Sequence, residues 1–558
     1  MTDLDESVTT IHPVETVGRW IGPPDRPLMA WFTTPVGHTG AVGVVIVPPL
    51  GYELWTSYRT LRTLAERLAG QGCTVVRFDL AGTGDSSGAQ WDADRLEAWR
   101  GDVAVAVAAV REVGVDSLVL IGLRMGASLA VAEGARLGTD AVVAWAPVVR
   151  GRRYVRELQM LGLPVPEDLD RPERAGAIVH AGTVFSSTTL ADLSALDLAT
   201  IGQSPAHRIL IIDREDKPAS TALIDRVTEL GTRPDHRVLG GTESLLDQPT
   251  EYATVAEGII GEIASWVGSG DLRQGTIPPA VSSALTWQGG TISEQVVRIG
   301  ERQLVGILTL PAGEPRATVV WLNSGSEHHI GPGRAWVEYA RDLALEGYAS
   351  LRVDFSGWGE SPDGEHAPGR PYDPHGIDEV AQIVTGLRGL GHQRIVVAGL
   401  CSGAWIAMRA ALSVDLDGVV AINPQLYWQP GDPVEADIVA ETRVRRHDEI
   451  ARIKKFKRWG VWSALDALGV RHPGASWLRA LDRRGVPVMA LFAEGDDGLE
   501  FLEDRTGRTW GLVRRHGHIE EAVIDEIDHP MHRHWRRQGV VSTIRSWLDR
   551  VVAADTRT

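Results

Sequence analysis

A Gly-x-Cys-x-Gly segment between a buried strand and a helix constrains this sequence more than any other feature. The apolar run 395–398 leads into Gly399-Leu400-Cys401-Ser402-Gly403, and a helical pattern follows at 404–409. A strand, a sharp turn and a helix in this order form the setting in which G-x-S-x-G places a nucleophile, and the glycines permit the tight turn. Cysteine at the nucleophile position indicates acyl transfer through a thiolate. The alternative is a small buried apolar residue, as most free cysteines are.

The same segment occurs half a chain earlier with different chemistry. The apolar run 118–121 leads into Gly122-Leu123-Arg124-Met125-Gly126. An Asp-x-x-Gly-x-Gly-[Asp/Glu]-Ser turn (79–86 and 354–361) and a helical segment (64–72 and 340–347) also recur at nearly the same spacing. This near-constant spacing indicates a tandem duplication. In the first copy Arg124 replaces the nucleophile, and a permanently protonated guanidinium cannot attack a carbonyl.

The bulk properties predict a two-domain globular protein. A chain of 558 residues exceeds the size at which one hydrophobic core stops growing. The net charge of −17 argues against nucleic acid as a partner. Cys73 and Cys401 are the 2 cysteines, so we expect no disulfide framework and a reducing, cytoplasmic environment. No apolar run is long enough to span a membrane, and the acidic start lacks the features of a signal peptide.

The boundary between the halves is predicted near 268–271, with a Gly-, Pro- and Ser-rich linker at 275–283. We therefore expect domains at 1–270 and 284–558. In each, strands alternate with helical patterns, which predicts a mostly parallel sheet. Interruptions at about 149–204 and 426–484 are predicted to be helical caps over the carboxyl edge of the sheet, where ligands bind in open α/β folds.

The elbow, the Asp-x-x-Gly turn and the order of strands and helices make both halves resemble the α/β-hydrolase superfamily. The resemblance covers nearly the whole chain and is specific for the fold, but much less so for the substrate. It implies two tandem α/β-hydrolase-fold domains, each with a cap. The cysteine resembles that of dienelactone hydrolases, polyhydroxyalkanoate synthases and some acyl-transferring thioesterase relatives. The opening at 48–53 and the elbow are similar to bacterial hydrolase-like proteins associated with lipid or secondary-metabolite assembly.

This resemblance also implies a catalytic triad in the order nucleophile, acid, histidine. Asp496 follows the late strand 486–492 and is the expected acid, with Asp497 as the alternative. His529 follows the last strand and would take the proton of Cys401, while the acid fixes its tautomer. His529 could instead be one of several solvated histidines with His532 and His534. A metal site from these three is disfavoured because no second cluster supplies further ligands.

The oxyanion donors implied by the family are the backbone N–H of Ser402 and one from the loop 323–326, for which Ser324 is the candidate. The remaining candidates are expected to bind substrate, three of them at the mouth of the pocket: His328, His329 and Arg334, together with Trp405.

The N-terminal half is predicted not to catalyse by this route. Its acid position holds Asp213 or Asp216, and the loop 240–244, where the histidine belongs, contains none. Arg124 is expected to form a buried ion pair with Glu243 or Asp213, because an unpaired buried charge is costly. Binding an anionic ligand such as a phosphate or carboxylate is the alternative. Cys73 precedes a buried strand and is expected in the core.

The second cap carries a basic run in an otherwise acidic protein. A solvated helix face is the default interpretation, and a docking patch for an acyl carrier protein or the phosphates of coenzyme A is the alternative. Its members are Arg443, Arg445, Arg446, Arg452, Lys454, Lys455, Lys457 and Arg458.

Together these features predict a hydrolase of acyl esters or thioesters that works through an acyl-cysteine and needs no cofactor or metal. An acyltransferase that passes the acyl group to an amine, alcohol or thiol is the first alternative. A non-catalytic binding or scaffold protein of hydrolase ancestry is the second, since Arg124 shows that one half has lost its nucleophile.

Overall fold

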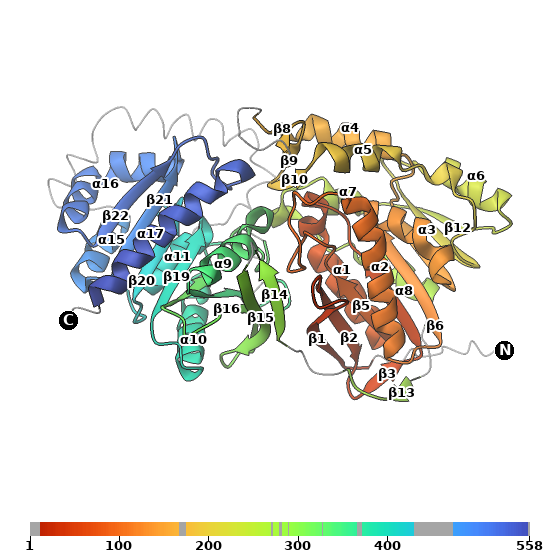
Figure 1. The fold of residues 1–558 in the computed structure, drawn as a ribbon, viewed down its shortest axis with the longest axis horizontal. Helices are drawn as coiled ribbons and strands as arrows, with labels where there is room; N and C mark the ends of the chain where they lie inside the picture. The colour runs from red at the N-terminus through yellow and green to blue at the C-terminus, as the bar shows by residue number, and fades with distance from the viewer. Residues whose placement is uncertain are drawn as a thin grey trace, which may run out of the picture. The chain divides into compact units, whose positions relative to one another are not determined.

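A computed structural model describes residues 12–166, 174–268, 272–277, 282–287, 290–325, 327–364, 371–428 and 473–555. The chain divides into two compact units, Met1–Leu285 and Thr286–Thr558, drawn from red to yellow-green and from green to blue in Figure 1. Each unit contains its own large β-sheet. In the described ranges, no helix has both the length and the hydropathy that crossing a membrane requires.

The sheet of the first unit has the strand order β1-β2-β5-β4-β6-β7-β11-β12. β1 and β2 pair antiparallel, β2 and β5 do likewise, and the remaining neighbours are parallel. The strands are β1 (Val14–Ile21), β2 (Leu28–Pro35), β4 (Val42–Val47), β5 (Cys73–Phe78), β6 (Ser117–Leu123), β7 (Ala141–Trp145), β11 (Arg208–Arg214) and β12 (Asp235–Leu239).

Helices cover both faces of this sheet, which is why its central strands are continuous apolar runs. Successive side chains of a strand point to opposite faces. Accordingly Val44 and Ile46 belong to one apolar cluster, and Val45 and Val47 belong to the other. The first cluster includes α1 (Tyr52–Gly70), α7 (Thr242–Leu246) and α8 (Glu257–Val267), and the second includes α2 (Arg95–Glu112), α3 (Met125–Leu137) and α6 (Thr221–Glu229).

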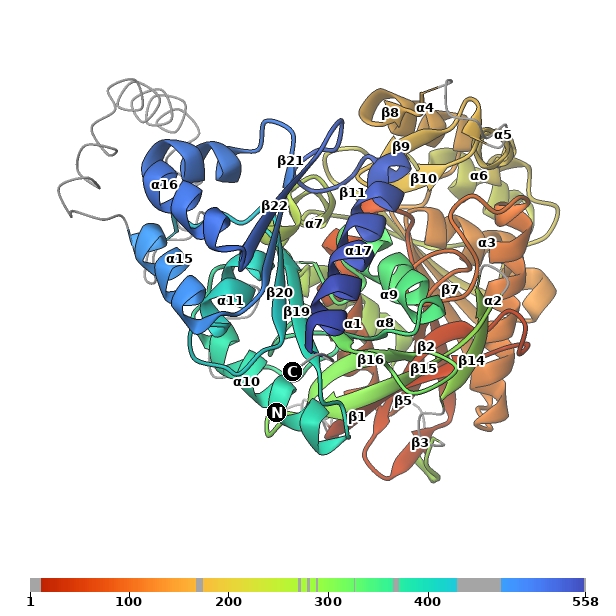
Figure 2. The same ribbon diagram turned by 60° about the vertical axis from the view of Figure 1, so that its left-hand side comes forward.

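An insertion between β7 and β11 occupies the first predicted cap. Figures 1 and 2 show its elements gathered at one end of the first unit. A helical insertion was expected here, but a small antiparallel sheet accompanies the helices, since strands of two or three residues have no periodicity to read. The elements are α4 (Gly151–Leu161), β8 (Leu163–Pro164), β9 (Ile178–His180), β10 (Thr183–Phe185), α5 (Ser187–Ala195) and η2 (Leu198–Thr200). Elsewhere β3 (His38–Gly40) pairs with β13 (Leu272–Gln274), and η3 (Thr250–Tyr252) precedes α8.

The sheet of the second unit has the order β14-β15-β16-β18-β17-β19-β20-β21-β22. Its last eight strands repeat the order of the first sheet, with the same two antiparallel pairings at one side. The strands are β14 (Ser283–Trp287), β15 (Gly290–Ile299), β16 (Leu304–Leu310), β17 (Thr318–Trp321), β18 (Ala349–Val353), β19 (Ile395–Leu400), β20 (Gly418–Ile422), β21 (Val488–Ala493) and β22 (Ile519–Ile524).

Helices again cover both faces, as Figure 2 shows. One face carries η4 (Pro332–Arg334), α9 (Ala335–Leu345), η6 (His534–Arg536) and α17 (Arg537–Asp555). The other carries α10 (His375–Gly389), α11 (Ser402–Ala410), α15 (Pro473–Arg484) and α16 (Asp497–His516). Of the second predicted cap, residues 429–472 lie outside the described residues, and so does the basic run from Arg443 to Arg458.

Candidate active site

Cys401 lies at the turn from β19 into α11, in a strained backbone conformation with φ 55° and ψ −110°. Its N–H donates to the carbonyl of Ile422 at 2.9 Å, which ties the turn to the neighbouring strand. Gly399 and Gly403 are required here, because a Cβ on either would come within 2.6 Å of backbone atoms. A non-glycine residue at such a φ costs about 1–3 kcal/mol, and strain of this kind concentrates at functional sites.

Asp496 and His529 come together beside this turn. The Nδ1 atom of His529 lies 2.5 Å from Oδ2 of Asp496, whose other oxygen accepts the Gly498 N–H at 2.8 Å. Asp496 is buried, whereas its alternative Asp497 is exposed at the start of α16. The carboxylate that contacts the histidine is therefore Asp496.

The electrostatic environment favours the protonated form of His529. Burial lowers the pKa of this imidazole, but hydrogen bonds with Asp496 and Cys401, and the charges of both groups, outweigh it and raise the pKa to about 10. His529 is then an imidazolium at neutral pH. A histidine next to a cysteine is the pairing in which a base can activate the sulfur as a nucleophile.

Asn423 joins the loops that carry the acid and the histidine. It follows β20 with φ 46°, and its Nδ2 donates to the carbonyl of His529 at 2.8 Å. Its Oδ1 accepts the Ala493 N–H at 2.7 Å, at the end of the strand that leads to Asp496. Sequence reasoning missed Asn423, although a polar residue directly after a buried strand was a readable signal.

Tyr372 is a second residue that the sequence did not reveal. Its hydroxyl lies 3.0 Å from Cys401 Sγ and 2.5 Å from Oε1 of Gln425. Burial, followed by the nearby Cys401, raises the pKa of Tyr372 well above its ordinary value, so the phenol stays protonated. Its ring stacks on Trp428 with centroids 5.1 Å apart.

Trp405 packs against the ring of this tyrosine. Its indole is fully buried and meets the ring of Tyr372 edge-on, with centroids 6.0 Å apart. The indole N–H donates to the carbonyl of Trp428 at 3.1 Å. We expected Trp405 to bind substrate, and the structure instead places it in the packing behind Tyr372.

Ser402 and Ser324 are the expected oxyanion residues. A hydrogen bond joins the start of α11, which holds Ser402, to the loop that holds Ser324. Ser402 is the first residue of α11, and its hydroxyl accepts the Gly325 N–H at 3.1 Å. Ser402 and Ser324 are both buried. The amide of Ser402 also belongs to a helix N-terminus, where N–H groups and the helix dipole favour negative charge.

The three residues expected at the mouth of the pocket are buried instead. His329 has no exposed surface, and its Nδ1 lies 2.6 Å from Oδ2 of Asp354, which begins the Asp-x-x-Gly turn. Burial raises the pKa of Asp354, but His329 outweighs this effect and lowers it. His328 packs edge-on against His329, and Arg334 is 2% exposed with φ 74°. These side chains are therefore packed in the interior, next to the loops around the elbow.

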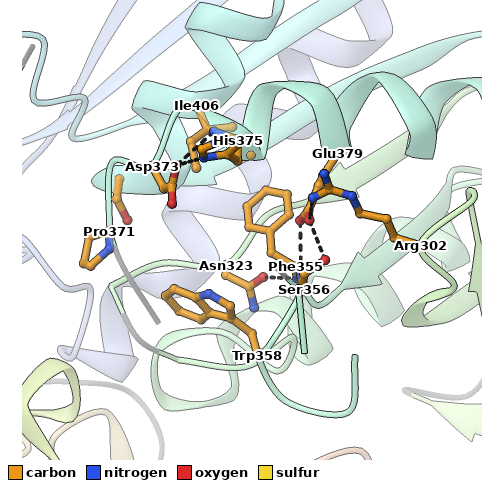
Figure 3. Close-up of a pocket in the computed structure, with 13 residues that line it drawn as sticks. Arg302, Asn323, Phe355, Ser356, Trp358, Pro371, Asp373, His375, Glu379 and Ile406 are labelled. Atoms are coloured by element: carbon orange, nitrogen blue, oxygen red, sulfur yellow. Dashed lines mark hydrogen bonds and ion pairs between the residues drawn. The ribbon is translucent and has the colours of Figure 1, made fainter. Parts of the chain in front are cut away.

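Ser402 is among the residues that line a small cavity with both polar and apolar walls, which Figure 3 shows in close-up. Its volume is about 50 Å³, which suits water rather than a substrate. Glu379 organises it, as Figure 3 shows, by accepting hydrogen bonds from the Ser356 hydroxyl at 2.5 Å and from Arg302 at 2.8 Å.

The histidines near the C-terminus have separate partners. His534 lies 3.1 Å from a carboxylate oxygen of Glu338, and His532 lies 3.8 Å from Asp528. Across the described part of the chain, no group of three or more His, Cys, Asp or Glu side chains is placed to hold a metal ion.

The corresponding turn of the first unit holds Arg124, with φ 54°. Its guanidinium contacts Glu53 at 2.6 Å and Glu157 at 3.2 Å, and it lies 5.7 Å from the ring of Tyr154. The expectation of an ion pair holds, but the expected partners are wrong. Its partner Glu53 lies at the start of α1.

The expected partners of Arg124 have other roles. Glu243 accepts the Gly241 N–H at 2.9 Å, and Asp216, the alternative residue for the acid position, pairs with Arg214 at 2.8 Å. Asp213 accepts a hydrogen bond from the Ser220 hydroxyl at 2.7 Å and lies 3.0 Å from His236. Cys73 is buried at the start of β5.

Comparisons with known proteins match both halves to related families. Residues 54–169 match the model described as "Serine aminopeptidase, S33", and residues 319–554 match the model "Alpha/beta hydrolase family". No curated protein matches the sequence.

Solved structures similar to this chain include several esterases, each about half its length. Est1E from Butyrivibrio proteoclasticus with bound ferulic acid is 15% identical over 44% of this chain and 97% of its own, with a TM-score of 0.35. Brefeldin A esterase, a bacterial homologue of human hormone sensitive lipase, is 18% identical over 48% and 80%, with a TM-score of 0.33. The Pyrococcus furiosus esterase Pf2001 is 18% identical over 46% and 92%, with a TM-score of 0.33.

Proposed function

The two halves of this chain are tandem α/β-hydrolase-fold domains, and we propose that the C-terminal one hydrolyses acyl esters or thioesters through an acyl-cysteine. One observation carries the proposal: Cys401 occupies the strained elbow beside His529, and His529 contacts the buried Asp496. A histidine beside the sulfur, oriented by a buried carboxylate, is an arrangement that activates a nucleophile.

In the first step the thiolate of Cys401 attacks the carbonyl carbon of the acyl substrate, and a C–S bond forms. The carbonyl oxygen becomes an oxyanion that accepts hydrogen bonds from the amides of Ser402 and Ser324. Collapse of this intermediate breaks the bond to the leaving alcohol or thiol. His529 donates its proton to that leaving group, and Asp496 maintains the orientation of the imidazole.

In the second step water releases the acyl group. The neutral His529 takes a proton from a water molecule, and the resulting hydroxide adds to the acyl-cysteine carbonyl. The C–S bond breaks, the carboxylic acid leaves, and the thiolate–imidazolium pair is restored.

Transfer to another acceptor is a second candidate, and the identity of the nucleophile supports it. An acyl-Cys401 is a thioester, which reacts with amines and thiols more readily than the ester of a serine does. An amine, alcohol or thiol would then replace water in the second step. The acyl donor in either case would be a small molecule, an acyl carrier protein or coenzyme A.

A purely structural role fits the first domain better than the second. Arg124 replaces the nucleophile there, and the loop 240–244 contains no histidine. The second domain has a candidate for each catalytic role, which argues against a scaffold of two inactive halves.

The direct test is acylation of the full-length protein with p-nitrophenyl butyrate, read by intact mass and peptide mapping. We expect one butyryl group on Cys401 and none on Cys73. Cys401→Ala removes the adduct and His529→Ala slows its formation, whereas the matched control Cys73→Ala keeps both rate and adduct. Equal acylation of Cys401→Ala and the parent would refute the proposal.

A further inference from the structure

A second, larger cavity lies in the first domain at the elbow that holds Arg124. Its volume is about 690 Å³, within the range of about 300–1,000 Å³ usual for small-molecule sites. Arg124 and Glu53 line it from the elbow side, and Tyr154, Glu157 and Leu158 line it from α4 of the insertion.

Backbone hydrogen bonds show that Arg124 and Cys401 occupy matching turns, so this cavity lies where the second domain has its candidate active site. The Arg124 N–H donates to Trp145 at 3.0 Å as that of Cys401 does to Ile422 at 2.9 Å. Ala146 follows Trp145, and Asn423 follows Ile422. Both have φ 46°, and their N–H groups donate to the matching strands β11 and β21. The first domain has therefore kept the elbow and a space beside it while losing the nucleophile.

The lining of this cavity holds more cationic than carboxylate groups, and Asp197 and Asp216 pair with two of the cations, Arg150 and Arg214, from outside the lining. Three carboxylates line the cavity, from Glu53, Glu157 and Asp247. Five cationic groups line it, from Arg124, Arg150, Arg153, Arg214 and Lys217.

The cations differ in how firmly they are held. Arg124 is fixed by Glu53 and stays 16% exposed, so its position is set before any ligand arrives. Arg150 and Arg153 are each 64% exposed, and their ion pairs are 3.4 Å long. Exposed pairs of this kind contribute little free energy, so these arginines can exchange their partners for a bound anion. Lys217 is 53% exposed and is equally accessible.

Apolar side chains form the rest of the wall. A ligand with a charged head and an apolar body would satisfy both parts of such a site, whereas an inorganic anion would leave the apolar wall unused. The apolar residues include Leu50, Val148, Val149, Leu158, Leu161 and Leu246.

We propose that the first domain binds an organic monocarboxylate with an apolar body in this cavity, with its head near Arg153 and Lys217. A singly charged head has to displace only the exposed pairs of these two cations, whereas a polyanion would also meet the carboxylates of Glu157 and Asp247. The cavity then serves as a receptor site, since its elbow presents a fixed guanidinium where the elbow of the second domain presents a thiol.

Calorimetric titration of the full-length Cys401→Ala protein with sodium octanoate tests this inference. We expect saturable binding at one site, with octanol and octylamine bound about tenfold more weakly or not at all. Ala222→Trp, which projects an indole into the cavity from the first turn of α6, should remove octanoate binding. Ala195→Trp, at an exposed position of α5 outside the cavity, is the matched control and should bind as before.

Lys217→Glu gives a second variant at an exposed position, and we expect octanoate binding weakened about tenfold. The inference is overturned by no binding of octanoate, by equal binding of octylamine, or by unchanged binding in Ala222→Trp. It does not depend on the proposed hydrolase, because acylation of Cys401 in an Ala222→Trp protein measures that activity separately.

Discussion

Cys401 and Arg124 occupy the same strained backbone position, with φ 55° and φ 54°, at matching turns of two sheets that share one strand order. Each donates its N–H to the next strand and each begins a helix. The turn therefore persists whether its side chain is a thiol or a guanidinium. The two turns therefore differ in the side chain that they present and not in their backbone.

The effect of Asp496→Asn on the pH profile of Cys401 acylation tests the acid. Contacts with Asp496 help to raise the pKa of His529 to about 10, so His529 is protonated below that pH and loses its proton as the pH rises through it. Removing the carboxylate lowers this pKa. The alkaline limb should move to lower pH, and the rate at neutral pH should fall about 100-fold or more. Asp497→Asn, one residue away and exposed, should leave the profile unchanged.

Tyr372→Phe should lower the thiolate content and the acylation rate of Cys401. The hydroxyl lies 3.0 Å from Sγ, and a hydrogen bond to a charged group contributes about 1.5–3 kcal/mol, or roughly tenfold or more in rate. Thiolate absorbance in the ultraviolet and single-turnover acylation measure the two effects. Tyr427→Phe is the control, because that ring packs against Phe501 with centroids 5.5 Å apart. A Tyr372→Phe protein with normal thiolate absorbance would show that the phenol only fills space.

Cys401→Ser separates hydrolysis from transfer. The variant keeps the elbow but replaces the thioester intermediate with an ester, which amines and thiols attack less readily. A transferase should lose its amine and thiol acceptors disproportionately and retain slow hydrolysis, as product analysis with competing acceptors would reveal. If the variant matches the parent with every acceptor, sulfur has no special role.

Arg124→Ala should destabilise the first domain without slowing Cys401 acylation. Its removal leaves the partly buried Glu53 without a 2.6 Å partner, and such a loss costs about 1–3 kcal/mol. Urea unfolding followed by circular dichroism measures the change. Glu53→Gln in the Arg124→Ala background should cost less than it does alone, since the pair acts as a unit. Additive effects would mean that the ion pair contributes nothing.

The sequence was sufficient to predict the fold and to bring three candidate residues to one place. Cys401, Asp496 and His529 each follow a strand, and the carboxyl ends of parallel strands meet at one edge of a sheet. The order of the motifs along the chain was therefore enough to predict that these three residues lie at the same edge of the sheet. Whether these three residues catalyse stays a prediction for the acylation test above.

Contacts between distant side chains were beyond this reasoning. Tyr372 reaches Cys401, and Glu53 reaches Arg124, through the geometry of loops and packing rather than through any spacing in the sequence. His329 illustrates the opposite error. A histidine near a catalytic loop was expected in the pocket, but Asp354 holds it in the interior. For each of these side chains the sequence offers many possible contact partners, and the fold determines which of them it meets.

Glu294 anchors the second sheet, and Glu294→Gln is the sharpest test of its core. The carboxylate is fully buried and lies 2.7 Å from both Arg341 and Arg352, which are also fully buried. The amide removes the negative charge that both guanidinium groups contact. Breaking such a buried pair costs about 3–5 kcal/mol, because an uncompensated charge stays in the interior.

Urea unfolding of Glu294→Gln should therefore show a much lower midpoint for the second domain. Glu520→Gln, in β22 of the same sheet, removes a half-exposed pair with Arg550 of α17, and such a pair contributes about 0–1 kcal/mol. The two substitutions change the same chemical group and differ in burial. Equal effects would show that the buried charge cluster does not stabilise the sheet, whereas a large difference assigns the stabilisation to the desolvated contacts of Glu294.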